Sequence, residues 1–77
     1  MSVAIRTPDG LVRQVEPKGN ENALYMAWRI ATLHGLLKGS KAPTYRLRSA
    51  AGPLNPNLRM KNYKQPVGEI LKLEPKP

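Results

Sequence analysis

Residues 21–38 read ENALYMAWRIATLHGLLK, and this stretch decides the fold. At 100° per residue it forms a helix whose polar residues occupy a sector of only about 100°. Ala23, Ala27 and Ala31 recur every four residues as a stripe of small side chains. Such a stripe lets a β-sheet approach the helix axis closely. We therefore predict a central helix over 21–38, with Asn20 as N-cap and Gly39 after its end.

The apolar arc of this helix is wider than one small sheet needs to cover. An excess of apolar surface predicts a second contact, either with another protein or with the chain's own segment 50–66. The candidate protein-interface residues are Trp28, Leu33, Leu36 and Leu37.

Alternating residues before and after the helix predict strands. Residues 3–15 form a β-hairpin around Thr7-Pro8-Asp9-Gly10, since Pro, Asp and Gly suit successive turn positions. Two further strands cover 44–49 and 67–73. The side chains expected to meet the alanine stripe are Val3, Ile5, Tyr45, Leu47, Leu71 and Leu73.

These elements predict a small α+β domain over residues 1–73, in ββαββ order. One long helix lies across a mainly antiparallel sheet. Residues 50–66 lack periodicity and contain Gly52-Pro53, Asn55-Pro56 and Gln65-Pro66, so they predict a long basic loop before the last strand. Residues 74–77 are expected to be a mobile tail.

Charge is concentrated in one third of the chain. The net charge is +8, and residues 41–66 hold six cations and no acid. Two arginines at i and i+2 of a strand lie about 7 Å apart, close to the spacing of phosphates along a nucleic-acid strand. The predicted phosphate-contacting residues are Arg46, Arg48, Arg59, Lys61 and Lys64, and Tyr63 is expected to stack on a base.

The composition does not favour catalysis. The chain has no cysteine and one histidine, His34, so we predict no metal site and no cofactor. The carboxylates form no recognisable catalytic pair, and the six glycines are isolated. Residues Tyr45 to Arg48 are similar to a strand of RelE-type ribonuclease toxins, which cut RNA with Arg, Lys and Tyr. That family usually has two helices before its sheet, whereas one is predicted here.

We therefore predict a non-enzymatic nucleic-acid-binding module, DNA and RNA being equally open. An acidic protein surface is the other partner that the charge would suit. The alternative function is a protein-binding or assembly factor, such as a phage-type virion component or a modulator of a host enzyme such as RNA polymerase. It would act through its apolar helix and strand edges, as a homo-oligomer or in a larger assembly. No membrane span or signal peptide is recognisable, so a cytoplasmic or virion location is expected.

Overall fold

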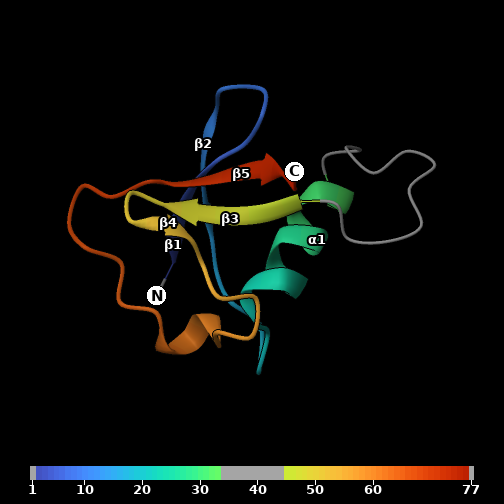
Figure 1. The fold of residues 1–77 in the computed structure, drawn as a ribbon, viewed down its shortest axis with the longest axis vertical. Helices are drawn as coiled ribbons and strands as arrows, with labels where there is room; N and C mark the ends of the chain where they lie inside the picture. Colours follow the sequence, from blue (N-terminus) through green and yellow to red (C-terminus); the bar gives the residue numbers. More distant parts are fainter. Residues whose placement is uncertain (1, 34–44, 77) are drawn as a thin grey trace.

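The computed structural model describes residues 2–33 and 45–76 and forms an α+β fold with one helix and one five-stranded mixed sheet (Figure 1). The strand order is β2-β1-β5-β3-β4. Strand β1 runs parallel to β5, and the other three neighbouring pairs are antiparallel. The elements are β1 (Val3–Arg6), β2 (Val12–Val15), α1 (Ala23–Leu33), β3 (Tyr45–Ser49), β4 (Gly52–Pro53), the 3-10 helix η1 (Met60–Asn62) and β5 (Leu71–Pro75).

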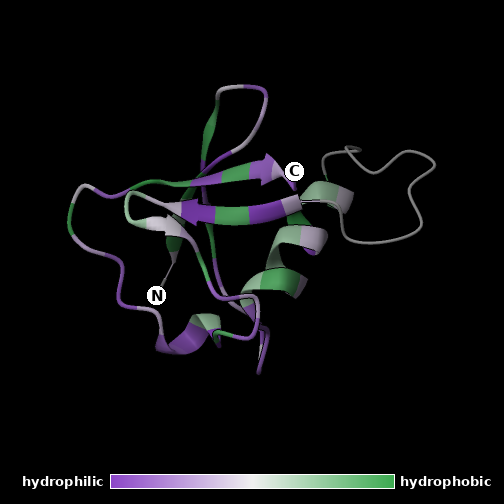
Figure 2. Ribbon diagram, viewed as in Figure 1, coloured by the Kyte–Doolittle hydropathy of each residue, from purple (hydrophilic) through white to green (hydrophobic). Residues whose placement is uncertain are grey.

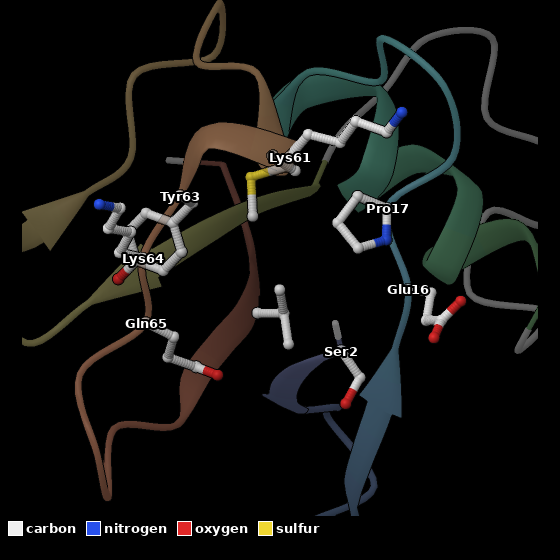
Figure 3. A pocket seen from close by; sticks show the side chains of 9 residues that line it. Ser2, Glu16, Pro17, Lys61, Tyr63, Lys64 and Gln65 are labelled. Atoms are coloured by element: carbon white, nitrogen blue, oxygen red, sulfur yellow. The ribbon is translucent and has the colours of Figure 1, made fainter.

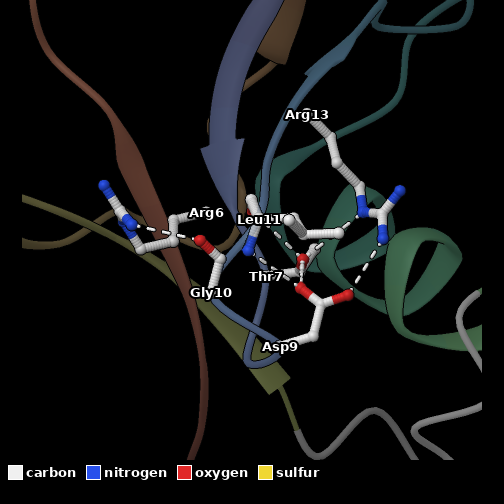
Figure 4. Close-up of polar contacts among 6 residues, drawn as sticks. All are labelled: Arg6, Thr7, Asp9, Gly10, Leu11 and Arg13. Atoms are coloured by element: carbon white, nitrogen blue, oxygen red, sulfur yellow. Dashed lines mark hydrogen bonds and ion pairs between the residues drawn. The ribbon is translucent and has the colours of Figure 1, made fainter.

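The hairpin is confirmed, and its turn is built as the sequence indicates (Figure 4). Thr7 and Leu11 close the turn through a backbone hydrogen bond of 3.0 Å, and Gly10 adopts a φ of 87°. The Asp9 carboxylate accepts hydrogen bonds from the Thr7 hydroxyl and the Leu11 N–H, and it forms an ion pair with Arg13 at 2.9 Å. These three donors lower the pKa of Asp9 to about 2.

The alanine stripe packs on the sheet as predicted. Ala23, Ala27 and Ala31 are all buried in the core, and β3 contacts α1 directly. The sheet contributes five buried side chains on the same side: Val3, Ile5, Leu47, Leu71 and Leu73. Tyr45 is only partly buried against them. Because strand residues alternate, the residues between the buried ones project to the other side of the sheet, called here the outer face. Figure 2 shows hydrophilic and hydrophobic residues alternating along β3 and β5.

The start of the helix differs from the prediction. Asn22, and not Asn20, is the cap: its side-chain oxygen accepts the Tyr25 N–H at 2.8 Å. Just before α1, the backbone pairs with the segment 56–60, where Ala23 N–H reaches Leu58 and Met60 N–H reaches Glu21. This pairing holds residues 21 and 22 out of the helix. The predicted end at Lys38, with Gly39 beyond it, lies outside the described residues.

Residues 50–66 are not an irregular loop. They contain β4 and η1, and Met60 is only 1% exposed in the core. Side chains close the local turns: Ser49 Oγ donates to the Gly52 carbonyl, and Asn55 accepts the Asn57 N–H. These bonds are local and differ from one turn to the next. The segment is therefore ordered without a repeating pattern in its sequence. The additional strand makes the order ββαβββ.

The last strand lies further along the chain than predicted. Residues 66–69 form a turn closed by a bond from Glu69 N–H to the Pro66 carbonyl, with Gly68 at a φ of 85°. Strand β5 runs from Leu71 to Pro75, so Glu74 and Pro75 are paired in the sheet and not part of a mobile tail.

Candidate functional site

Arg46 and Arg48 project from the outer face of β3, as the alternation predicted. In the antiparallel register with β5, Arg46 lies opposite Glu74 and Arg48 lies opposite Lys72. Leu47 between them is 1% exposed on the core side, whereas the Arg48 side chain is 49% exposed. The two arginines therefore share a face, but Arg46 lies opposite an acidic residue and Arg48 lies opposite a basic one.

Glu74 compensates much of the charge of Arg46. Its carboxylate lies 2.8 Å from Arg46 Nε and 2.7 Å from a terminal nitrogen of the same guanidinium, and 3.7 Å from Arg48. The hydrogen bond from Arg46 lowers the pKa of Glu74, with help from the positive charges of Arg48 and Lys72. Arg46 is consequently half-buried in an ion pair, and Arg48 is the freer of the two.

Three exposed cations lie side by side on the outer face. Arg6 in β1 is the register partner of Lys72 in β5, and Lys72 is the partner of Arg48 in β3. Neighbouring strands are about 4.8 Å apart, so the three Cα atoms span about 10 Å. Arg6 also donates to the Gly10 carbonyl at 3.1 Å, and this bond orients its guanidinium. We call Arg6, Lys72 and Arg48 the cationic row.

The sequence prediction missed Arg6 and Lys72. Each alternates with buried residues of its own strand, and that alternation indicates an outward direction. The register across β1, β5 and β3, by contrast, depends on contacts between residues far apart in the chain. No local pattern specifies that register.

The other predicted cations lie around η1. Arg59 forms an isolated backbone bridge with Asn22, while Lys61 and Lys64 line a hollow with Ser2 and Glu16. Figure 3 shows the two lysine amines pointing to opposite sides of this hollow. In the part of the chain that the structure describes, none of these three cations has an ion-pair partner within 4 Å. They form a second charged group, and the row residues do not line this hollow.

Tyr63 is engaged by the protein itself. Its ring is half-buried against the core, and its hydroxyl donates a hydrogen bond to Glu69. Burial and this bond raise the pKa of Tyr63 to about 12. The geometry gives Tyr63 a structural contact, and a base could reach only the part of the ring left open.

The predicted protein-interface residues do not gather on one patch. Trp28 is half-buried and packs against Tyr25, with ring centroids 5.3 Å apart. Leu33 is 70% exposed, but five residues turn about 140° around a helix, so it points elsewhere. Leu36 and Leu37 lie outside the described residues, as does His34.

Two features are absent from residues 2–33 and 45–76. No group of three or more His, Cys, Asp or Glu side chains is placed there to hold a metal ion. No helix in this part of the chain is long and apolar enough to cross a membrane.

No protein-family model, no curated protein and no solved structure matches the chain.

Proposed function

We propose that this protein is a non-enzymatic nucleic-acid-binding module whose outer sheet face contacts the phosphate backbone. The observation that carries the proposal is the register that aligns Arg6, Lys72 and Arg48 across three neighbouring strands. Phosphate contacts from such cations release counterions, which makes the binding salt-dependent and only weakly sequence-specific.

The cations of the outer face are not equally available to phosphates. Arg46 is held by Glu74, so it supports the row and contributes less charge of its own. Arg6 and Arg48 offer planar guanidinium groups that suit phosphate oxygens, and Lys72 lies between them. Arg59, Lys61 and Lys64 are the competing set of contacts, on the surface around η1.

Two triple variants separate these sets because each removes three positive charges from the net +8. One carries Arg6→Gln, Arg48→Gln and Lys72→Gln. The other carries Arg59→Gln, Lys61→Gln and Lys64→Gln. Binding to fluorescein-labelled duplex DNA and to single-stranded RNA is measured by anisotropy at about 50 and 200 mM salt, where phosphate-driven affinity changes steeply.

We expect the row variant to flatten the slope of log K against log salt by about 3 on duplex DNA. The variant with Arg59→Gln, Lys61→Gln and Lys64→Gln should change this slope less. An equal loss of affinity in both variants would mean that binding depends on the total charge alone. Unchanged binding in the row variant would overturn the proposal.

A second candidate function, assembly with another protein through α1, is favoured by the exposure of Leu33. A leucine that is 70% exposed on a helix leaves apolar area for a partner. If α1 mediates self-association, Leu33→Lys will lower the mass in solution measured by analytical ultracentrifugation. An unchanged mass would remove the self-association version of this candidate.

A further inference from the structure

An apolar groove lies between the first turn of α1 and the segment 53–56, beside β3. It has a volume of about 310 Å³, near the lower end of the range for small ligand sites. Its lining includes half-buried Leu24 and Leu54 together with exposed Pro53 and Pro56. The groove is therefore large enough for one or two apolar side chains.

The groove continues along α1. Leu24 also lines a second hollow, which it shares with Asn22, Tyr25 and Trp28. The tilted pair of Tyr25 and Trp28 forms an aromatic wall there. Aromatic side chains of this kind are enriched among the residues that dominate binding energy at interfaces. The two hollows together form an apolar strip that an extended chain can follow.

The rim of the groove is positive. Among the residues that the structure describes, Arg46 and Lys76 are the charged residues of its lining, and no acid contributes to it. Arg46 is paired with Glu74, whereas Lys76 has no ion pair with any residue in the described ranges. Lys76 is thus the cation available to a bound ligand, in a chain whose net charge is already +8.

Strand addition does not suit this edge of the sheet. The edge strand β4 is two residues long, and Pro53 has no N–H to donate to an added strand. A partner must therefore bind here through its side chains, in the groove and at the rim.

We propose that the groove docks an extended peptide segment of a partner protein, with apolar side chains flanked by acidic residues. The apolar side chains fill the space between Leu24, Leu54 and Pro56. A neighbouring carboxylate pairs with Lys76 at the rim. The groove borders the cationic row, because Pro53 in its lining lies opposite Arg48 in the register of β3 and β4, whereas Arg6 and Lys72 do not line it.

The test uses the full chain and the synthetic peptide GDELFDEG, with GKKLFKKG as its charge-reversed control. Trp28 is the only tryptophan of the complex and adjoins the groove, so its emission reports occupancy. Labelled peptide and anisotropy provide the affinity. We expect the acidic peptide to bind at least about tenfold more tightly than the basic one and to shift the Trp28 emission. Equal binding of both peptides, or none, would overturn the proposal.

Variants locate the binding. Lys76→Glu should weaken the acidic peptide about fivefold, and Leu24→Ser about tenfold or more. Lys18→Glu is the matched control, because it makes the same charge change at an exposed residue outside the groove. Far-ultraviolet circular dichroism checks that each variant is folded. An equal effect of Lys18→Glu and Lys76→Glu would contradict the groove as the site.

Two outcomes would identify other ligands. Self-association that Leu24→Ser abolishes would make a second copy of this chain the occupant, contrary to the proposal. Loss of acidic-peptide binding in a variant with Arg6→Gln and Lys72→Gln, two row residues that do not line the groove, would show that the peptide binds the cationic row, contrary to the proposal. If the groove is occupied as proposed, these two substitutions leave the peptide-induced shift of Trp28 unchanged.

Discussion

The side-chain amide of Gln65 pairs with the backbone of Ala4 as a strand residue would. It accepts the Ala4 N–H at 2.9 Å and donates to the Ala4 carbonyl at 3.0 Å. Strand β5 pairs with β1 only at Ile5 and Arg6, so the amide continues the ladder where β5 has not yet begun. One side chain thus joins the segment before β5 to the first strand of the chain.

Replacing Gln65 by Leu should destabilise the fold. The change leaves the N–H and carbonyl of Ala4 without partners, and each partly buried group left unsatisfied costs about 1–3 kcal/mol. The free energy of unfolding, measured by urea titration, gives the loss. Gln14→Leu is the control, because Gln14 is exposed and, among the described residues, its side chain accepts a bond only from Ser2, so a change below about 0.5 kcal/mol is expected. Similar losses in the two variants would show that the Gln65 amide does not support β1.

Met60→Ala should destabilise the protein by about 2–5 kcal/mol, the usual cost of truncating a buried methionine. Met60 is 1% exposed although it lies in a segment without sequence periodicity. Lys61→Ala, in the same 3-10 helix but exposed, should change the unfolding free energy little. A small effect of Met60→Ala would mean that residues 50–66 do not pack on the core in solution.

Glu74→Gln should strengthen nucleic-acid binding. The change frees Arg46 and relieves Arg48 of a carboxylate 3.7 Å away. One additional phosphate contact steepens the salt slope by about 1 and tightens binding about threefold at low salt. Glu16→Gln makes the same charge change beside Lys61 and Lys64. Tighter binding in Glu16→Gln alone would transfer the site to the surface around η1.

The hairpin should lose stability in acid because of Asp9. Its pKa is lowered from 3.8 to about 2 in the folded chain, so the folded state favours the ionised carboxylate. The resulting stabilisation is complete above pH 3.8 and is lost as the pH falls through about 2. Asp9→Asn should therefore lower the melting temperature at pH 7, while wild type and variant converge near pH 2. A constant difference across this range would contradict the role of the ionised Asp9.

Much of the architecture could be predicted from local patterns. In the turn Thr7-Pro8-Asp9-Gly10 each residue type suits its turn position. The alanine stripe of α1 and the alternation of β3 repeat with the periods of a helix and a strand. Such patterns indicate the face of the helix or strand from which a side chain projects. They correctly placed Arg46 and Arg48 on the outer face and Leu47 in the core.

The boundaries and pairings were less predictable. The start of α1 depends on backbone bonds to residues 56–60, and those bonds join segments more than thirty positions apart. The end of β5 depends on pairing with β3, which also brings Glu74 to Arg46. Glu74 was predicted to lie in a mobile tail, where it would have no partner. The sequence prediction therefore counted Arg46 as a free positive charge, whereas Glu74 compensates it.

The sequence by itself determined the hairpin, the central helix with its buried alanine stripe, the two faces of β3 and an excess of positive charge, because all of these follow from residue types at short spacings. Only the tertiary structure decided which charges are neighbours. The register of β1, β5 and β3 sets Arg6, Lys72 and Arg48 in one row, and it sets Glu74 against Arg46. Register depends on packing and hydrogen bonds between distant segments, and a one-residue slip would turn every one of these side chains to the other face.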